Sequence, residues 1–166
     1  MDLIIADTFP LILLAKLDLL ESVCRIFRVA ATAEVFHEAT CKKELPDAMC
    51  ITRIVQSGYI RVETVDSEAV TSMRDEWKIG LGEASVFVLA QLAPSVLMLD
   101  DYAAISIARA EGLRYITTPV LIYELGRRNH LSVRQATDKL VALKQHAWIS
   151  DDVIEQVLCW LGKGVN

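Results

Sequence analysis

Leu3-Ile4-Ile5-Ala6-Asp7 is a short apolar run that a carboxylate closes. Runs of this kind, in a chain that mixes strand and helix signals, are typical of parallel strands buried on both faces. A second run, from Ser95 to Leu99, follows the same pattern and is closed by Asp100 and Asp101. We therefore predict two buried strands that each end in aspartate.

Helix signals separate these runs from three further strand-like stretches. We expect those strands at Phe27 to Ala30, at Tyr59 to Val65 on a sheet edge, and at Leu113 to Thr117. A Leu-rich helix from Pro10 to Leu20 should break near Asp18. Further helix starts are indicated at Thr32, Pro46, Asp66 or Ser67, Gly82 or Glu83, Tyr102, Thr118-Pro119, Ser132 and Ser150. Strands that alternate with helices predict a three-layer α/β/α sandwich around a largely parallel central sheet.

The composition indicates one soluble domain that spans residues 1–166. This length is enough to bury a substantial core, and no apolar run reaches the roughly 18 residues of a membrane-spanning helix. The acidic first residues do not resemble a secretory signal, so a cytoplasmic location is expected. Four cysteines without a CxxC pair suggest buried thiols rather than a zinc site or disulfides.

The net charge of -5 argues against a protein that holds nucleic acid through an overall basic surface. It does not exclude a nuclease, because carboxylates gathered around Mg²⁺ make the metal-free chain acidic. The bound cations would then attract phosphate at the site itself.

The candidate site is a set of carboxylates at one edge of the predicted sheet. In open parallel sheets the functional crevice lies beyond the C-terminal ends of the strands, where Asp7, Asp100 and Asp101 are expected. Glu38 and Glu83 are the further candidates, each on a predicted helix. Carboxylates that gather in this way repel one another unless cations neutralise them. Mg²⁺ or Mn²⁺ would do so, and a two-metal site hydrolyses phosphodiester bonds.

At these residues the chain resembles the PIN-domain nucleases. The pieces are Ile5-Ala6-Asp7-Thr8-Phe9-Pro10-Leu11, Val35-Phe36-His37-Glu38, Gly82-Glu83-Ala84-Ser85 and Leu99-Asp100-Asp101, in the order of that family. The Gly-Glu-Ala and Asp-Asp pieces are similar to a branch that includes the VapC-like toxin ribonucleases of bacterial toxin-antitoxin pairs. The resemblance covers most of the chain.

The resemblance implies a metal-dependent endoribonuclease with RNA as substrate and a small antitoxin protein as partner. It also implies that Asp7, Glu38, Glu83 and Asp100 or Asp101 are the catalytic, metal-binding set. Two positions depart from the family pattern, because Phe9 replaces a small polar residue and Tyr102 stands where an arginine is common. Such changes near the carboxylates would weaken their hydrogen-bonding support.

The apolar composition also predicts a homodimer. The chain is 53% hydrophobic, and its helical C-terminal third offers Trp148, Leu158, Trp160 and Leu161 as surface that one domain does not readily hide. The tryptophans are interpreted as core or interface residues. Short basic runs, Lys42-Lys43 and Arg127-Arg128, could approach a nucleic-acid backbone, although such runs are usually solvated surface.

Other interpretations of the same residues stay open. Asp7 could make only local backbone bonds, Glu38 could lie on a solvated helix face, and Glu83 or Asp101 could serve a helix N-terminus. A non-catalytic PIN-like binding or assembly module is the main rival. A phosphatase or a receiver-like domain is a second rival, but a receiver would want a lysine where Thr117 and Thr118 stand.

Overall fold

The computed structural model describes residues 3–163, and its centre is a sheet of five parallel strands in the order β3-β2-β1-β4-β5. The strands are β1 (Leu3–Ala6), β2 (Arg28–Thr32), β3 (Ile60–Glu63), β4 (Val96–Met98) and β5 (Tyr115–Ile116). All the predicted strands are present, and β3 lies on an edge as expected. Strands β4 and β5 are shorter than predicted, by one or two residues at each end.

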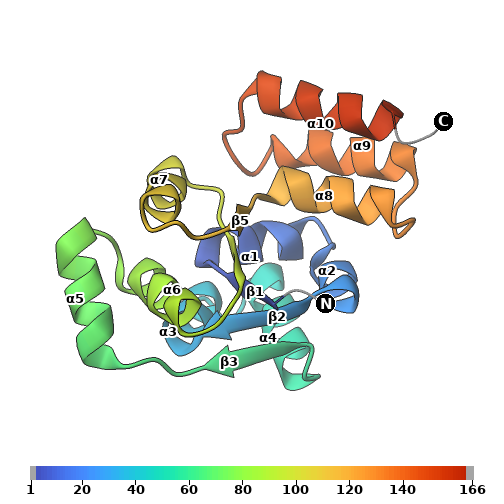
Figure 1. The fold of residues 1–166 in the computed structure, drawn as a ribbon. Helices are drawn as coiled ribbons and strands as arrows, with labels where there is room; N and C mark the ends of the chain where they lie inside the picture. The colour runs from blue at the N-terminus through green and yellow to red at the C-terminus, as the bar shows by residue number, and fades with distance from the viewer. Residues whose placement is uncertain (1–2, 164–166) are drawn as a thin grey trace.

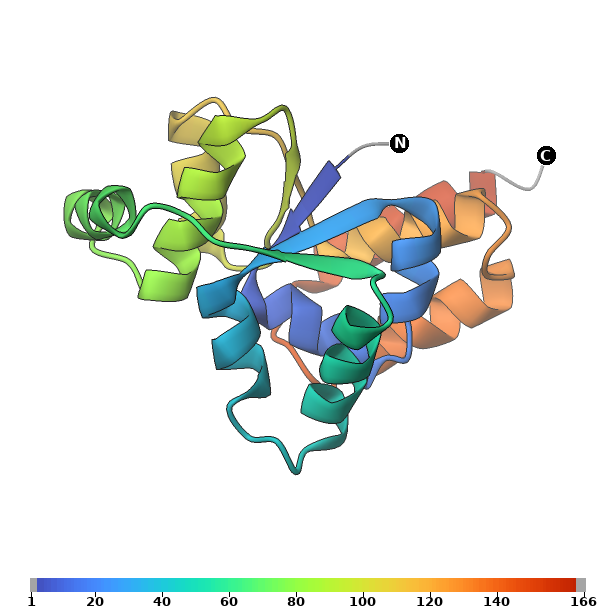
Figure 2. The same cartoon turned by 90° about the horizontal axis from the view of Figure 1, so that it is seen from below.

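The helices of residues 3–163 lie between and after these strands. They are α1 (Thr8–Lys16), α2 (Leu20–Ile26), α3 (Ala33–Thr40), α4 (Pro46–Gln56), α5 (Ser67–Trp77), α6 (Leu81–Leu92), α7 (Tyr102–Ala110), α8 (Thr118–Arg127), α9 (Val133–Leu143) and α10 (Asp151–Lys163). Helix α6 packs against β1, β2 and β4 on one face of the sheet, with α5 beside it. Helices α2 and α4 contact the strands from the other face, where α1 packs on α4 (Figures 1 and 2).

Several of the expected breaks and caps are formed by the expected residues. Asp18 separates α1 from α2 with a left-handed backbone, at a φ of 55°. The side chain of Thr32 accepts a hydrogen bond from the backbone N–H of Val35 and caps α3, and Asp66 caps α5 in the same way. Ser132 and Gln135 form the predicted capping box of α9. For α8 the capping position is Thr117 rather than Thr118, which is the first helical residue.

Strand β1 is the centre of the core. Ile4 and Ile5 are fully buried and pair with β2 on one side and β4 on the other, in the registers Ile5↔Ala30 and Ile5↔Leu97. This burial on both faces explains why the run is apolar without alternation. Along the chain, β2 and β3 are added to the sheet on one side of β1, and β4 and β5 are then added on the other side. In open parallel sheets a reversal of this kind is where the functional crevice is expected, and here it falls between the C-terminal ends of β1 and β4.

The C-terminal third forms a unit of three helices, α8, α9 and α10, which pack on one another and touch α1 and α2 through α8 (Figure 1). Trp160 contacts Tyr123 in this unit, with ring centroids 5.6 Å apart. Trp148 lies in the connection between α9 and α10 and is 93% exposed, so it is not a core residue. No helix within residues 3–163 is long and apolar enough to cross a membrane.

The cysteines are free thiols, as the spacing suggested, but not all of them are buried. Cys24 is buried, and burial raises the pKa of its thiol to about 12. Cys41 and Cys159 are exposed, so the expectation of buried thiols is wrong for these two. Cys41 lies directly after α3 and Cys159 on the outer side of α10, where a small residue faces solvent without cost.

Candidate metal centre

Asp7 and Asp100 follow β1 and β4, the two neighbouring strands between which the strand order reverses. Ala6 pairs with Met98 across β1 and β4, and the backbone N–H of Asp7 donates to the carbonyl of Met98 at 3.2 Å. Asp100 follows Met98 by two residues. Both aspartates therefore leave the sheet at the same edge and on neighbouring strands, as the sequence predicted. Both side chains are partly buried.

Glu38 reaches this edge from α3, and two small residues receive its carboxylate. The hydroxyl of Thr8, in the first turn of α1, donates to Oε2 of Glu38 at 2.6 Å. Gly82, in the first turn of α6, lies beside the same carboxylate. A Cβ atom on Gly82 would stand 2.6 Å from the same Oε2, which is inside van der Waals contact. Glycine at this position thus leaves the space that the Glu38 carboxylate occupies.

Glu83 follows Gly82 and carries its carboxylate at the N-terminal turn of α6. Desolvation by burial is the largest cause that raises the pKa of Glu83, and the charges of Asp7, Asp101 and Glu38 raise it as well. Glu83 is therefore within electrostatic range of the same group. A role in helix capping was the rival interpretation, and a bond to the backbone of Gly80 does lower the pKa in part.

Asp100 is fixed by Thr118, a residue that the sequence suggested as a helix start and as a position where a receiver-like domain would need a lysine. The backbone N–H of Thr118 donates to Oδ1 of Asp100 at 2.8 Å, and its hydroxyl donates to Oδ2 at 2.5 Å. Thr118 is fully buried. Its position shortly after β5, at the same sheet edge as the aspartates, was the available signal. Each carboxylate oxygen keeps a second lone pair, so Asp100 can still bind another partner.

Asp101 has a different environment. Its side chain accepts a hydrogen bond from the backbone N–H of Ala104 at 3.0 Å and caps α7, as the rival interpretation proposed. Its charge nevertheless raises the pKa of both Asp7 and Glu83. Asp100 and Asp101 thus both belong to the acidic group, but Asp100 is the one held by a buried side chain.

The carboxylates of the group are crowded together. Desolvation by burial is the largest cause that raises the pKa of Asp7, and the charges of Glu38, Asp100 and Asp101 add to it; against the opposing backbone hydrogen bond at Thr8, the pKa is about 6. Desolvation also raises the pKa of Asp100, and the two bonds from Thr118 oppose this. Negative charge is thus unfavourable at this edge unless a cation is nearby.

The donor set fits a hard divalent cation. Among residues 3–163, no group of three or more acidic, histidine or cysteine side chains is arranged so that it could hold a metal ion. Mg²⁺ does not need such a group, because it keeps several waters and is usually held by one or two carboxylates. Carboxylate oxygens are the ligands that Mg²⁺ and Mn²⁺ prefer. The space that Gly82 leaves beside Glu38 further shows that a carboxylate is accommodated here.

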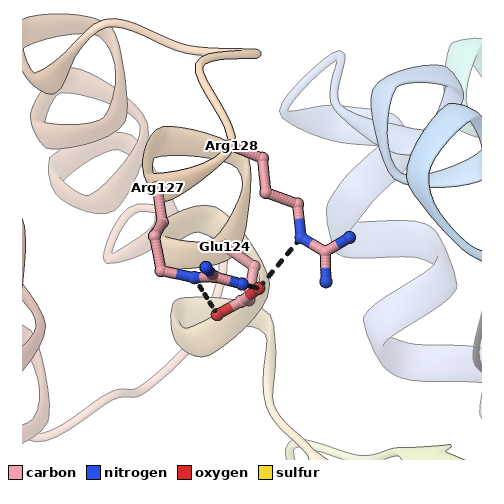
Figure 3. Close-up of polar contacts among 3 residues, drawn as sticks. All are labelled: Glu124, Arg127 and Arg128. Atoms are coloured by element: carbon pink, nitrogen blue, oxygen red, sulfur yellow. Dashed lines mark hydrogen bonds and ion pairs between the residues drawn. The ribbon is translucent and has the colours of Figure 1, made fainter.

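The arginines that could have met a nucleic-acid backbone lie elsewhere. Arg127 and Arg128, at the end of α8, both donate to Glu124, at distances from 2.7 to 3.1 Å (Figure 3). The guanidinium of Arg128 also lies 4.9 Å from the ring centroid of Phe27, which directly precedes β2. The starts of parallel strands are at the opposite edge from their ends. These arginines are therefore not neighbours of the acidic group.

Comparison with known proteins agrees with this geometry. A family model described as a PIN domain matches residues 3–163, which are all of the residues that the structure describes. No curated protein matches the chain significantly. The finding covers the strands, the acidic residues and the C-terminal helices together.

Asp7 should destabilise the metal-free protein as the pH rises. Its pKa in the folded state, about 6, exceeds the ordinary 3.8, so the folded state binds more protons between these values. The free energy of unfolding should then fall through this pH window, by up to about 3 kcal/mol. Asp7→Asn keeps the shape without the charge. In chelator at pH 7.5 we expect this variant to melt roughly 5–10 °C above the native protein, with a smaller difference at pH 4.5. Equal melting temperatures at pH 7.5 would contradict the account.

Gly82→Ala should displace the carboxylate of Glu38. The added methyl meets the far end of a flexible side chain, so the fold should remain while Glu38 moves. We expect calorimetric titration with Mn²⁺ to give an affinity about 10 to 100 times lower than that of the native protein. Gly80→Ala is the matched control, because a Cβ at Gly80 meets nothing within 4 Å. Equal losses in both variants, or no loss in Gly82→Ala, would show that Glu38 has no part in cation binding.

Proposed function

Because the chain belongs to the family of PIN domains, which are generally nucleases, we propose that it is a metal-dependent endoribonuclease that hydrolyses phosphodiester bonds in RNA. The observation that carries this proposal is the meeting of Asp7 and Asp100 at the ends of neighbouring parallel strands, with Glu38 and Glu83 facing the same edge. The chemistry of the site, and not the fold alone, supports hydrolysis.

In this proposal Asp7, Glu38, Glu83 and Asp100, with Asp101 beside them, hold Mg²⁺ or Mn²⁺. When bound, the cations would supply Lewis acidity for attack of water on the phosphodiester and for the negative charge of the leaving oxygen. The protein chain holds the carboxylates in position. Asp7 and Asp100 extend from a sheet that is buried on both faces, so neither can drift far from the other.

Hydrogen bonds to the carboxylates complete this positioning. Thr8 orients Glu38, and Thr118 orients Asp100 through two bonds. Such partners of metal ligands strengthen metal binding because they fix the direction of the ligand oxygens. Burial of Thr118 also keeps water from replacing its bonds to Asp100. The arrangement supports an active site that is ready for cations before they bind.

We further propose that the protein acts in the cytoplasm as the toxin of a toxin-antitoxin pair. The similarity of Gly82-Glu83-Ala84 and Asp100-Asp101 to the toxin ribonucleases supports this idea. A small antitoxin would then bind near the acidic group and place a basic side chain there, in competition with the cations.

A homodimer stays a prediction. Of the four C-terminal residues that suggested it, Leu161 is buried, and Leu158 and Trp160 are half-buried within the three-helix unit. Trp148 is largely exposed. Other exposed apolar side chains, including Met49 on α4 and Leu92 at the end of α6, could still meet a second copy.

RNA cleavage should require a divalent cation and Asp7. With Mg²⁺ or Mn²⁺ present, we expect Asp7→Asn to reduce the cleavage rate by about a hundredfold or more, because the amide removes the charge that holds the cation. Asp138→Asn, on the exposed side of α9, is the matched control and should cleave at the native rate. Gel analysis of a labelled RNA measures the rates. Equal cleavage in chelator and in Mg²⁺ would exclude the proposed mechanism.

Expression of the protein alone should arrest growth of a bacterial host if it is a toxin. The growth arrest should disappear in Asp7→Asn, and co-expression of the neighbouring small open reading frame should relieve it and yield a stable complex. Growth curves and co-purification provide the measurements. If expression is harmless while the protein cleaves RNA in vitro, the toxin role is wrong and the nuclease activity stands. If there is neither toxicity nor cleavage, the non-catalytic binding module is favoured.

A further inference from the structure

Three exposed aromatic side chains line one groove beside the acidic group. Phe9, Tyr102 and Trp148 are 44%, 78% and 93% exposed, respectively. They share an open groove of about 720 Å³ with Asp100 and Asp101. Exposing a large aromatic side chain to water is unfavourable in free energy. Three exposed aromatic side chains in one groove therefore indicate a surface that binds a partner or ligand.

The three rings come from separate parts of the chain. Phe9 follows Asp7 by two residues in α1, and Tyr102 directly follows Asp101 as the first residue of α7. Trp148 belongs to the connection between α9 and α10, which is on the side of the helical unit that faces α7 in Figure 1. Two of the rings are thus attached to the same strand ends as the carboxylates, and the third faces them from the C-terminal unit.

We propose that this groove binds unpaired bases of a single-stranded nucleic acid on one side of the scissile phosphate, with Tyr102 and Trp148 as stacking surfaces. This inference rests on the proposed nuclease function and assigns residues that would bind the bases beside the cleaved bond. The groove is continuous with the acidic group, since Asp100 and Asp101 form part of its wall. A strand whose phosphate lies at these carboxylates must place its neighbouring nucleotides in or beside the groove.

The chemistry of the groove favours bases over phosphates. Its lining contains no lysine or arginine, and apart from the two aspartates it is mostly apolar, with Ile105, Pro119 and Val153 among the wall residues. A phosphate would be repelled by Asp100 and Asp101 except where a cation neutralises them. Every base has an uncharged π face that stacks on aromatic side chains, and this stacking tolerates any sequence.

The same reasoning excludes paired substrates from the groove. In a duplex the base faces are covered by neighbouring bases, and only their edges reach the surface. A side chain such as Trp148 can therefore stack on bases only where the strand is unpaired.

Phe9 and Tyr102 gain a role in this way. They are the two positions where the chain departs from the pattern of the nucleases it resembles, and both line the groove with Trp148. The sequence alone suggested that these changes weaken the site. Their shared location instead indicates that they replace polar groups near the carboxylates by a surface for substrate bases.

Cleavage kinetics with a single-stranded oligoribonucleotide test the proposal. Trp148→Ala should raise KM about tenfold, which corresponds to about 1.4 kcal/mol, and leave kcat close to native. Trp148→Phe should retain most of the affinity, because a ring remains. Tyr59→Ala removes an aromatic side chain that is 43% exposed, just before β3 at the far sheet edge, and is the matched control. It should leave KM unchanged.

Substrates with one abasic nucleotide make the test specific for stacking. At one position near the cleavage site, loss of the base should raise KM of the native protein by a similar factor but have no further effect on Trp148→Ala. A merely structural role of Trp148 would leave the abasic penalty intact in the variant. Unchanged KM in both Trp148→Ala and Tyr102→Ala, or equal cleavage of duplex and single strand, would overturn the proposal.

Binding separates this inference from the proposed function. If the native protein does not cleave, the same oligonucleotide should still quench tryptophan fluorescence in Mg²⁺, and Trp148→Phe should lose this quenching. That result would support the groove while the nuclease activity fails. Absence of quenching would overturn the groove. A homodimer that sediments as such in the native protein and dissociates in Trp148→Ala would also overturn it, because a second copy would then occupy the groove.

Discussion

The parallel pairing of β1 with β4 places two strand-end aspartates side by side, partly removed from water. Ala6 pairs with Met98, and the chain leaves both strands at the same edge. Desolvation and the neighbouring carboxylates raise the pKa of Asp7 to about 6. This arrangement costs stability in the absence of cations, since like charges in a partly dry site repel. Selection for stability alone would not bring these carboxylates together. Binding of a cation at the proposed metal centre accounts for their position.

The surrounding residues make this unfavourable group into an ordered one. Thr8 and Thr118 donate hydrogen bonds to Glu38 and Asp100, and Gly82 leaves room for the Glu38 carboxylate. None of these three residues is charged. The two threonines orient the carboxylates by hydrogen bonds, and Gly82 leaves space for one of them. Carboxylates from α3 and from the ends of β1 and β4 can therefore lie at one edge. The apolar core of β1, buried on both faces, holds the frame in place.

The strands, the three layers and the neighbouring positions of Asp7 and Asp100 could be predicted from the sequence. These features follow from apolar runs, caps and the geometry of parallel sheets, which are local or general. The hydrogen-bond partners of the carboxylates could not be predicted, because they come from distant segments of the chain. Thr118 meets Asp100 across 18 positions and Thr8 meets Glu38 across 30, and no local pattern encodes either bond. Likewise, the exposure of Trp148 and the pairing of Arg127 and Arg128 with Glu124 depend on how the C-terminal helices pack.

The most direct test of the metal centre is anomalous diffraction from crystals of the native protein soaked in Mn²⁺. We expect an anomalous peak at the C-terminal edge of β1 and β4, within coordination distance of carboxylate oxygens from Asp7 and at least one of Glu38, Glu83, Asp100 and Asp101. A well-ordered crystal without a peak there, or with its strongest peak on another acidic surface such as the start of α10, would contradict it.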